Sequence, residues 1–327
     1  MKKIYIYPSD PQIGQKKIKN PYITNFSSSL KGKMEIITLK RRTMAGLDFL
    51  RCSIKSDIII ANWVESISSN RAGVIQFLLA SITLLYIKIS HKKLVWMVHN
   101  MQPHEGRSVF SDVLSKELAS FADVIITHSQ DAVKLVHDKY GKHSFYRCHP
   151  ITPFQYGKSD TQKSIDILIW GTIIPYKGIS EFISSPMIQK SNYQILISGI
   201  CTDKSLENKI LEYCNDHIIF KNVRMDFNKI QALINNSRYV VFPYKKDSVS
   251  SSGVLIDTIA MGGTPIGPHR GALKDLQYEG VCITYKNEDE LCRILSGSHQ
   301  IDNITREQFV QNNSWESFAD FILELIN

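Results

Sequence analysis

Several features that identify common classes of protein are missing from this sequence of 327 residues. The six cysteines include no Cys-x-x-Cys pair, so they match neither a zinc site nor a disulfide framework, and buried free thiols in a reducing compartment are expected. The loop after the first predicted strand, Pro8 to Gln15, contains no Gly-x-Gly-x-x-Gly. That absence argues against a nicotinamide-dependent dehydrogenase. No signature of an RNA-recognition domain, a zinc finger or a helix-turn-helix is present either.

The first residues lack the apolar run and the small-residue cleavage site of a signal peptide. Met1 to Lys3 instead lead directly into a strand-like segment, Ile4 to Tyr7. Export is therefore not expected, and a cytoplasmic location is predicted.

Acidic residues are scarce in the first half of the chain. Residues 1–150 carry a net charge of +11, whereas residues 151–327 carry a net charge of −3. A basic surface attracts polyanions, and an anionic membrane is preferred over nucleic acid because no nucleic-acid-binding motif is present. The sequence thus predicts peripheral contact of the basic half with the inner face of the cell membrane, and a solvated basic face without a partner is the alternative.

The most apolar stretch, Ala72 to Ile89, is about as long as a minimal membrane span. Gln76 and Lys88 interrupt it, and its apolar side chains occur all round a helical wheel. The next segment, Lys93 to His99, reads as a strand that must pair with earlier strands. We therefore expect a helix that is buried or docked on a membrane rather than one that spans it.

Strand-like runs alternate with helical segments along the whole chain, which indicates parallel sheets covered by helices on both faces. A break near Cys148 to Lys163, rich in proline, glycine and polar residues, separates two such series. The predicted fold is therefore α/β, with two doubly wound, Rossmann-like domains, residues 1–155 and 156–327, facing each other across a cleft; the last helix is allowed to pack back on the first domain. The predicted strands are Ile4–Tyr7, Glu35–Leu39, Ile58–Ala61, Leu94–Val98, Val124–Thr127, Asp166–Trp170, Gln194–Ser198, Ile218–Lys221, Tyr239–Phe242 and Thr264–Ile266.

The segment Val240 to Leu276 predicts an anion site. A buried strand is followed by Pro-Tyr, two lysines and a Ser-Ser-Ser-Gly corner, after which a helix begins at about Gly253. The free amides and the positive dipole end of that helix attract anions, serine can cap it, and Gly253 permits close approach of a ligand. An ordinary strand-to-helix turn with a serine cap is the alternative.

Polar residues also follow other predicted strands, where the ligands of open α/β sheets bind. His99 comes after one strand, with His104 and Glu105 close behind it, and Lys177 lies in a turn after the strand Asp166–Trp170. Histidine and glutamate can transfer a proton, and a lysine can pair with a phosphate. Taken singly, each of these residues also has an ordinary structural explanation.

Three of these segments together resemble the GT-B glycosyltransferases of the family 4 kind, in particular the bacterial enzymes that build exopolysaccharide, capsule, O-antigen or lipopolysaccharide. Gly171 to Gly178 is similar to the family's G-x-[IL]-x-x-[YF]-K-G turn. Val241 to Leu276 resembles its PY-basic…SG-V-L-x-[DE]-x…G-x-P-[IV] segment, and His99 to Glu105 resembles an HN..PHE pattern. The resemblance covers both halves of the chain.

The resemblance implies a hexosyltransferase that uses a nucleotide-diphosphate sugar. It implies that Lys177 and Lys245 face the diphosphate, that Asp257 accepts hydrogen bonds from the ribose and that His99 contacts the donor sugar. The expected donor-binding residues are Gly171, Thr172, Lys177, Lys245, Ser251, Ser252, Gly253 and Asp257, and the expected catalytic residues are His99, His104 and Glu105. Lysines and a helix N-terminus can replace a metal ion at the leaving group, so neither metal nor cofactor is expected. The acceptor implied is a polyprenyl-diphosphate-linked saccharide at the membrane.

The sequence departs from the family pattern at two points. In the family, an arginine commonly lies beside the phosphate-binding lysine, but the corresponding positions here are Thr172 and Ile174. The family also carries a pair of glutamates in the helix segment; here Asp257 stands in place of the second, and the position of the first falls at about Val249. Inverting or retaining chemistry is left open, with Glu65 and Asp10 as further candidates for a base. Two alternatives also stay open: a catalytically silent GT-B subunit that binds a partner transferase, and a nucleotide-sugar epimerase or hydrolase.

Overall fold

The computed structural model describes residues 1–9, 21–39, 42–99, 108–154, 163–245 and 252–326. The chain divides into two compact units, which we treat separately. Unit 1 comprises Met1–Cys148 with Trp315–Asn327, and unit 2 comprises His149–Ser314. The sequence had placed the division after residue 155, and the last helix belongs to unit 1.

Unit 1 is built on a six-stranded sheet whose order is β2-β1-β3-β4-β5-β6, with every pair parallel. Tyr5 on β1, for example, pairs with Ile37 on β2 and with Ile59 on β3. The strands are β1 Lys3–Tyr7, β2 Glu35–Ile37, β3 Ile58–Asn62, β4 Lys93–Val98, β5 Val124–Thr127 and β6 Phe145–Tyr146.

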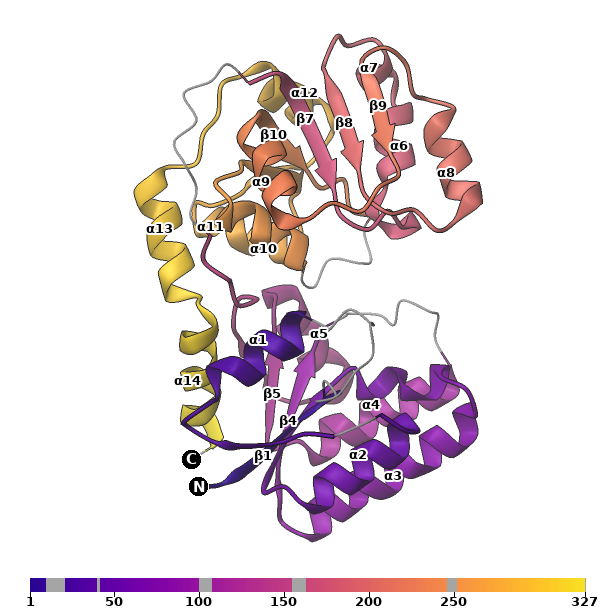
Figure 1. Cartoon of the computed structure of the whole chain (residues 1–327), viewed down its shortest axis with the longest axis vertical. Helices are drawn as coiled ribbons and strands as arrows, with labels where there is room; N and C mark the ends of the chain where they lie inside the picture. The colour runs from indigo at the N-terminus through magenta and orange to yellow at the C-terminus, as the bar shows by residue number, and fades with distance from the viewer. Residues whose placement is uncertain (10–20, 40–41, 100–107, 155–162, 246–251, 327) are drawn as a thin grey trace. The chain divides into compact units, whose positions relative to one another are not determined.

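Helices cover both faces of this sheet (Figure 1). One face packs against α2 (Ala45–Ile54), α3 (Gly73–Ile89) and α4 (Val109–Phe121), together with the short helix η1 (Val64–Ser69). The other face packs against α1 (Pro21–Ser29) and α14 (Trp315–Ile326), and α5 (Gln130–Tyr140) lies between β5 and β6 in the chain. Isoleucine and valine side chains fill both sides of the central strands, which explains why these strands read as continuous apolar runs.

Unit 2 holds a second six-stranded parallel sheet, in the order β12-β11-β10-β7-β8-β9. The strands are β7 Ile165–Trp170, β8 Ile195–Ser198, β9 Ile218–Lys221, β10 Ser237–Val241, β11 Pro265–Pro268 and β12 Ile283–Tyr285. The helices are η2 Pro175–Lys177, α6 Ile179–Ser184, α7 Pro186–Gln189, α8 Lys204–Leu211, α9 Phe227–Asn235, α10 Gly253–Ala260, α11 Gly271–Tyr278, α12 Glu288–Ser296 and α13 Asn303–Asn312.

The prediction of two parallel, doubly wound α/β sheets is confirmed. Each of the ten predicted strands is present to within a few residues, while β6 and β12 were missed. β6 has two residues and β12 has three partly buried residues, so neither gives a continuous apolar run. Within the described ranges, no helix is both long and apolar enough to cross a membrane.

Candidate functional site

Two segments meet at the point where the strand order of the second sheet reverses. β7 pairs with both β8 and β10, so the chain leaves β7 in one direction and returns beside it as β10. In open α/β sheets, ligands bind beyond the carboxyl ends of the strands at this reversal. The backbone N–H of Lys245, after β10, donates to the carbonyl oxygen of Tyr176, after β7, at 3.0 Å. The predicted lysine turn and the predicted anion corner are thus in contact.

Lys177 is the central cation of this edge. Its side chain is buried, and its Nζ lies 3.3 Å from the point where a Cβ on Gly171 would stand. The same point is 3.0 Å from Cγ2 of Val254, in the first turn of α10. Among the described residues, no carboxylate or other acceptor pairs with the ammonium group. Burial lowers the pKa of Lys177 from its usual 10.5 to about 8. A buried cation without a counter-ion next to a helix N-terminus is an arrangement that favours an anion.

The first turn of α10 begins with a serine cap, Ser252, followed by a glycine, Gly253. Ser252 accepts a hydrogen bond from the backbone N–H of Leu255 at 3.3 Å, and its hydroxyl is 2.9 Å from the hydroxyl of Tyr244. Among the residues that the structure describes, a Cβ added to Gly253 would meet nothing nearer than the His149 ring, at 4.0 Å. Burial lowers the pKa of His149 to about 4, and its Nδ1 lies 2.9 Å from the carbonyl oxygen of Pro150. His149 is therefore neutral at physiological pH, and the sequence had not singled it out.

Lys245 is placed differently from Lys177. Its Nζ is 2.5 Å from Oε1 of Glu181 on α6, and both side chains are about half exposed. The ion pair accounts for the lowered pKa of Glu181. A diphosphate would compete with Glu181 for this lysine, so the contact of Lys245 with the donor stays a prediction.

Asp257 lies one helical turn beyond Gly253 on α10. Burial raises the pKa of its carboxyl from 3.8 to about 7, and no described residue donates a hydrogen bond to that carboxyl. A carboxylate in such surroundings gains from hydroxyl donors, because they replace the water that burial removes. This is the property that a ribose ligand requires, and the assignment to ribose stays a prediction.

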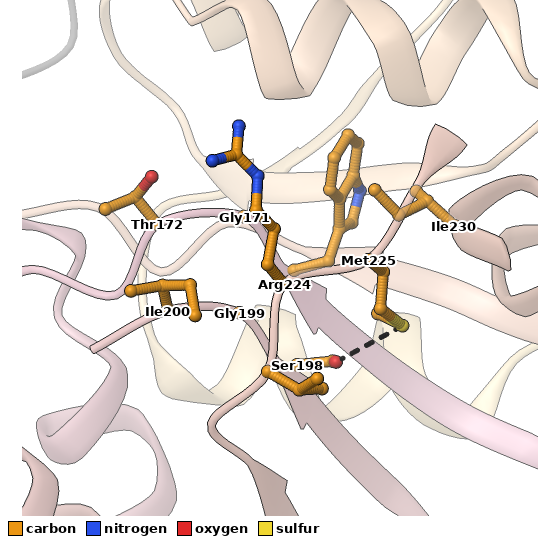
Figure 2. A pocket seen from close by; sticks show the side chains of 10 residues that line it. Gly171, Thr172, Ser198, Gly199, Ile200, Arg224, Met225 and Ile230 are labelled. Atoms are coloured by element: carbon orange, nitrogen blue, oxygen red, sulfur yellow. Dashed lines mark hydrogen bonds between the residues drawn. The ribbon is translucent and has the colours of Figure 1, made fainter. Parts of the chain in front are cut away.

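A pocket of about 310 Å³ lies beside Gly171 (Figure 2). Its walls come from the ends of β7 and β8 and from the segment that follows β9, and it is lined by Trp170, Gly171, Thr172, Ser198, Gly199, Ile200, Val223, Arg224, Met225 and Ile230. In Figure 2 the Arg224 guanidinium and the Thr172 hydroxyl extend in the same direction, while the dashed line joins Ser198 to the Met225 sulfur, 3.6 Å away. Gly171 belongs both to this pocket and to the surroundings of Lys177, so the two sites adjoin.

The backbone around the pocket depends on glycine. A Cβ on Gly199 would lie 1.7 Å from the carbonyl oxygen of Gly171, and a Cβ on Gly178 would lie 2.2 Å from the carbonyl oxygen of Pro243. Gly171 and Gly178 also adopt positive φ angles of 100° and 67°. Side chains at these positions would separate the loops, so the glycines allow the three strand ends to approach each other.

In unit 1, His99 follows β4 and lies in a cage of aromatic rings. The Trp63 ring stacks on it at a centroid distance of 4.1 Å, and the ring of Tyr22 approaches edge-on at 4.8 Å. His99 Nε2 is 2.8 Å from Oδ1 of Asn62, whose Nδ2 donates to the carbonyl oxygen of Tyr7 at 2.7 Å. Because the amide of Asn62 is fixed by Tyr7, its oxygen faces the histidine, and Nε2 of His99 carries the proton in this bond.

Glu65 is the other titratable residue at this edge that the sequence analysis named. It is buried in η1, and burial raises the pKa of its carboxyl to about 7. Such a pKa suits a general base near neutral pH. Three of the predicted site residues, His104, Glu105 and Ser251, lie outside the described residues, as does Asp10.

Sequence reasoning missed Arg224, His149 and the Tyr22 ring beside His99 as functional positions, whereas Asn62 and Trp63 directly follow the predicted strand Ile58–Ala61, at an edge where site residues were expected. Arg224 lies outside the three segments that carry the family resemblance, and His149 lies at the domain break. Among the described residues, no group of three or more His, Cys, Asp or Glu side chains could hold a metal ion.

The structure is similar to several solved glycosyltransferase structures. Anabaena HepE, solved in complex with UDP and with UDP-glucose, matches with a TM-score of 0.67 and 14% identity over 99% of both chains. The fold is GT-B. AviGT4, a glycosyltransferase of avilamycin A biosynthesis, matches with a TM-score of 0.63 and 11% identity over 99% of this chain and 96% of that chain. A UDP-forming α,α-trehalose-phosphate synthase from Burkholderia vietnamiensis matches with 0.62 and 11% over 99% of both chains.

A scan against protein-family models finds no match, and neither does a search of curated proteins. The GT-B expectation is thus confirmed at the level of the fold. The assignment to the family 4 kind stays a prediction.

Proposed function

We propose that this protein is a metal-independent glycosyltransferase that moves a sugar from a nucleoside diphosphate donor, bound by unit 2, to a saccharide acceptor bound by unit 1. The single observation that carries the proposal is the Lys177 ammonium group, which is buried beside the N-terminus of α10 and next to a pocket and which has no counter-ion among the residues that the structure describes. An isolated buried charge is costly, so a site that keeps one is organised for a ligand of opposite charge.

The chemistry follows from that charge. The oxygen of an acceptor hydroxyl forms a bond to the anomeric carbon of the sugar, the bond from that carbon to the β-phosphate oxygen breaks, and the hydroxyl loses its proton. Negative charge then develops on the departing nucleoside diphosphate. Lys177 and the amides at the start of α10 stabilise that charge, which is the task that a divalent cation performs in metal-dependent transferases.

Arg224 offers a replacement for the arginine that is absent from the lysine turn. Thr172, one of the two positions where the family pattern has arginine, lines the same pocket as Arg224. Among the described residues, no carboxylate pairs with the Arg224 guanidinium. We propose that Arg224 contacts the diphosphate or the ribose of the donor from the segment after β9.

The donor and the acceptor are proposed more specifically from similarity and charge. UDP and UDP-glucose are the ligands in the HepE structures, so a UDP-hexose is the first donor to test. The net charge of +11 in residues 1–150 suits a polyprenyl-diphosphate-linked acceptor, as in the synthesis of cell-surface polysaccharide.

The test is a transfer assay with purified protein, UDP-[14C]glucose and a polyprenyl-diphosphate-linked saccharide, in buffer containing a metal chelator. We expect labelled lipid to appear and the Lys177→Met variant to form none. If UDP binds but labelled glucose is released without acceptor, the protein is a hydrolase. If no nucleotide binds at all, it is a silent subunit.

A further inference from the structure

Helix α3 of unit 1 exposes its apolar side chains. Val74, Ile75, Leu78, Ile82, Leu85 and Ile89 are each between 50% and 68% exposed. At 100° per residue they all lie within one sector of about 100°, and with 1.5 Å of rise per residue the stripe runs for about 22 Å. Monomeric proteins seldom leave a continuous stripe of this kind in water. We call these six residues the α3 stripe.

The rotation of α3 that exposes the stripe is fixed by close contacts between its inner face and α2. Gln76 is buried, and its Oε1 accepts a hydrogen bond from the backbone N–H of Gly46 at the start of α2, at 2.6 Å. Thr83 is also buried, and its hydroxyl is satisfied within α3 itself, by the carbonyl oxygen of Leu79 at 2.6 Å. Gly46 lies so close to α3 that an added Cβ would be 2.9 Å from Cβ of Leu79. Turning the helix to bury the stripe would break the hydrogen bond between Gln76 and Gly46, and the polar side chain of Gln76 would lose its partner.

The apolar surface continues beyond α3. The Phe77 ring lies 4.8 Å from the ring of Phe110 on α4, and the neighbouring Val109 is 78% exposed. On the α2 side, Ile54 is 50% exposed. α2, α3 and α4 all cover the same face of the first sheet (Figure 1).

The charges that α2 and α3 present beside the stripe are positive, whereas α4 on the other side carries Asp112, which is paired with Lys139, and the partly buried Glu117. Arg51 and Lys55 on the α2 side, Lys88 on α3 and Arg71 just before α3 are exposed. α3 contains no carboxylate, and the single one in α2, Asp48, is buried and bonded to the backbone N–H of Thr43 at 2.8 Å. A second copy of this chain would present the same positive charges and be repelled. An anionic lipid surface offers both apolar depth and opposite charge.

We propose that the α3 stripe docks unit 1 on an anionic membrane, with α3 lying in the interface and Arg51, Lys55 and Lys88 contacting lipid head groups. The six apolar side chains enter the boundary between head groups and acyl chains, without crossing the bilayer. This inference goes beyond the transfer reaction and does not rest on it, because it concerns a surface of unit 1 that can be measured without donor or acceptor.

Flotation with vesicles tests the proposal. Wild-type protein is mixed with vesicles of phosphatidylcholine alone or of phosphatidylcholine with phosphatidylglycerol. We expect the wild type to bind the anionic vesicles. The affinity for these vesicles should fall by about tenfold or more in the L78Q/I82Q variant. In R51Q/K55Q/K88Q it should fall by about fivefold for each charge removed. The matched control L211Q/I304Q removes two equally exposed apolar side chains from unit 2 and should bind like the wild type.

Circular dichroism and thermal unfolding check that each variant is folded, which we expect because the changed side chains are exposed. Three results would overturn the proposal: no wild-type binding to anionic vesicles, equal binding by L78Q/I82Q, or equal binding to neutral vesicles. A lipid-free dimer that L78Q/I82Q converts to a monomer, seen by light scattering, would assign the stripe to self-association instead.

Discussion

Replacing Lys177 with methionine should stabilise the ligand-free protein while removing its affinity for a nucleoside diphosphate. The ammonium group is buried without a counter-ion among the described residues, and its pKa falls from 10.5 to about 8. Below pH 8 the folded protein therefore holds a charge that the unfolded chain carries at less cost. Methionine keeps most of the alkyl volume and removes the charge.

The expected magnitude follows from the pKa. A depression of this size corresponds to about 3 kcal/mol of unfolding free energy lost at neutral pH, and the wild type regains that stability as the pH rises from about 8 to 10.5. The variant should be more stable than the wild type at pH 7 and should lack this rise. Loss of the charged hydrogen bond to a phosphate should weaken UDP binding by about 10- to 150-fold.

Thermal unfolding with and without UDP, at pH 7 and pH 10, measures both effects, with the exposed Lys190→Met as the matched control. The wild type should gain stability from UDP, whereas the variant should be more stable without UDP and should gain much less at the same UDP concentration. A Lys177→Met protein that is less stable than the wild type and still responds to UDP would refute the reasoning, because Lys177 would then be a structural residue.

Three other changes are expected to have defined results. Arg224→Ala should weaken UDP binding by about tenfold in calorimetry. Adding Thr172→Arg to that variant should restore part of the lost affinity. If Arg224→Ala binds UDP as tightly as the wild type, Arg224 is not part of the donor site. The pKa of Asp257 is raised to about 7, so the affinity of the wild type for the donor should rise as the pH increases through 7 and the carboxyl ionises. Asp257→Asn should lose that pH dependence. If the variant shows the same pH profile as the wild type, the ribose assignment is contradicted. Gly199→Ala should unfold at a much lower denaturant concentration, because its Cβ would lie 1.7 Å from the Gly171 carbonyl oxygen. Gly253→Ala should fold normally, since no described residue comes nearer than 4.0 Å to its Cβ. Equal stability of the two variants would show that the loops can separate.

The sheets were predictable because parallel strands buried on both faces leave continuous apolar runs. β6 and β12 were missed because they are short and only partly buried. The contact of the Lys177 turn with α10 followed from the rule that ligands bind at strand ends, but the pairing of Lys245 with Glu181 did not, because no local pattern links a residue after β10 to α6. A helical wheel of α3 also could not show which side of the helix faces the sheet. That orientation is fixed by the hydrogen bond between Gln76 and the backbone N–H of Gly46 on α2.

Unit 1 shows the same limit. His99 was expected at the sheet edge from its position after β4, yet its partners Asn62 and Trp63 come from the end of β3. Sequence spacing gave no indication that Nε2 of His99 would face an amide oxygen. Arg224 is a similar case, since its contribution to the pocket depends on the three-dimensional path of the chain after β9.

The most direct test of the central claim is calorimetric titration of the purified protein with UDP, GDP, dTDP and CMP in metal-free buffer, with Lys177→Met in parallel. The account predicts that one nucleoside diphosphate binds at a single site per chain and that the variant loses this binding. Absence of binding by all four nucleotides, or undiminished binding to the variant, would contradict it.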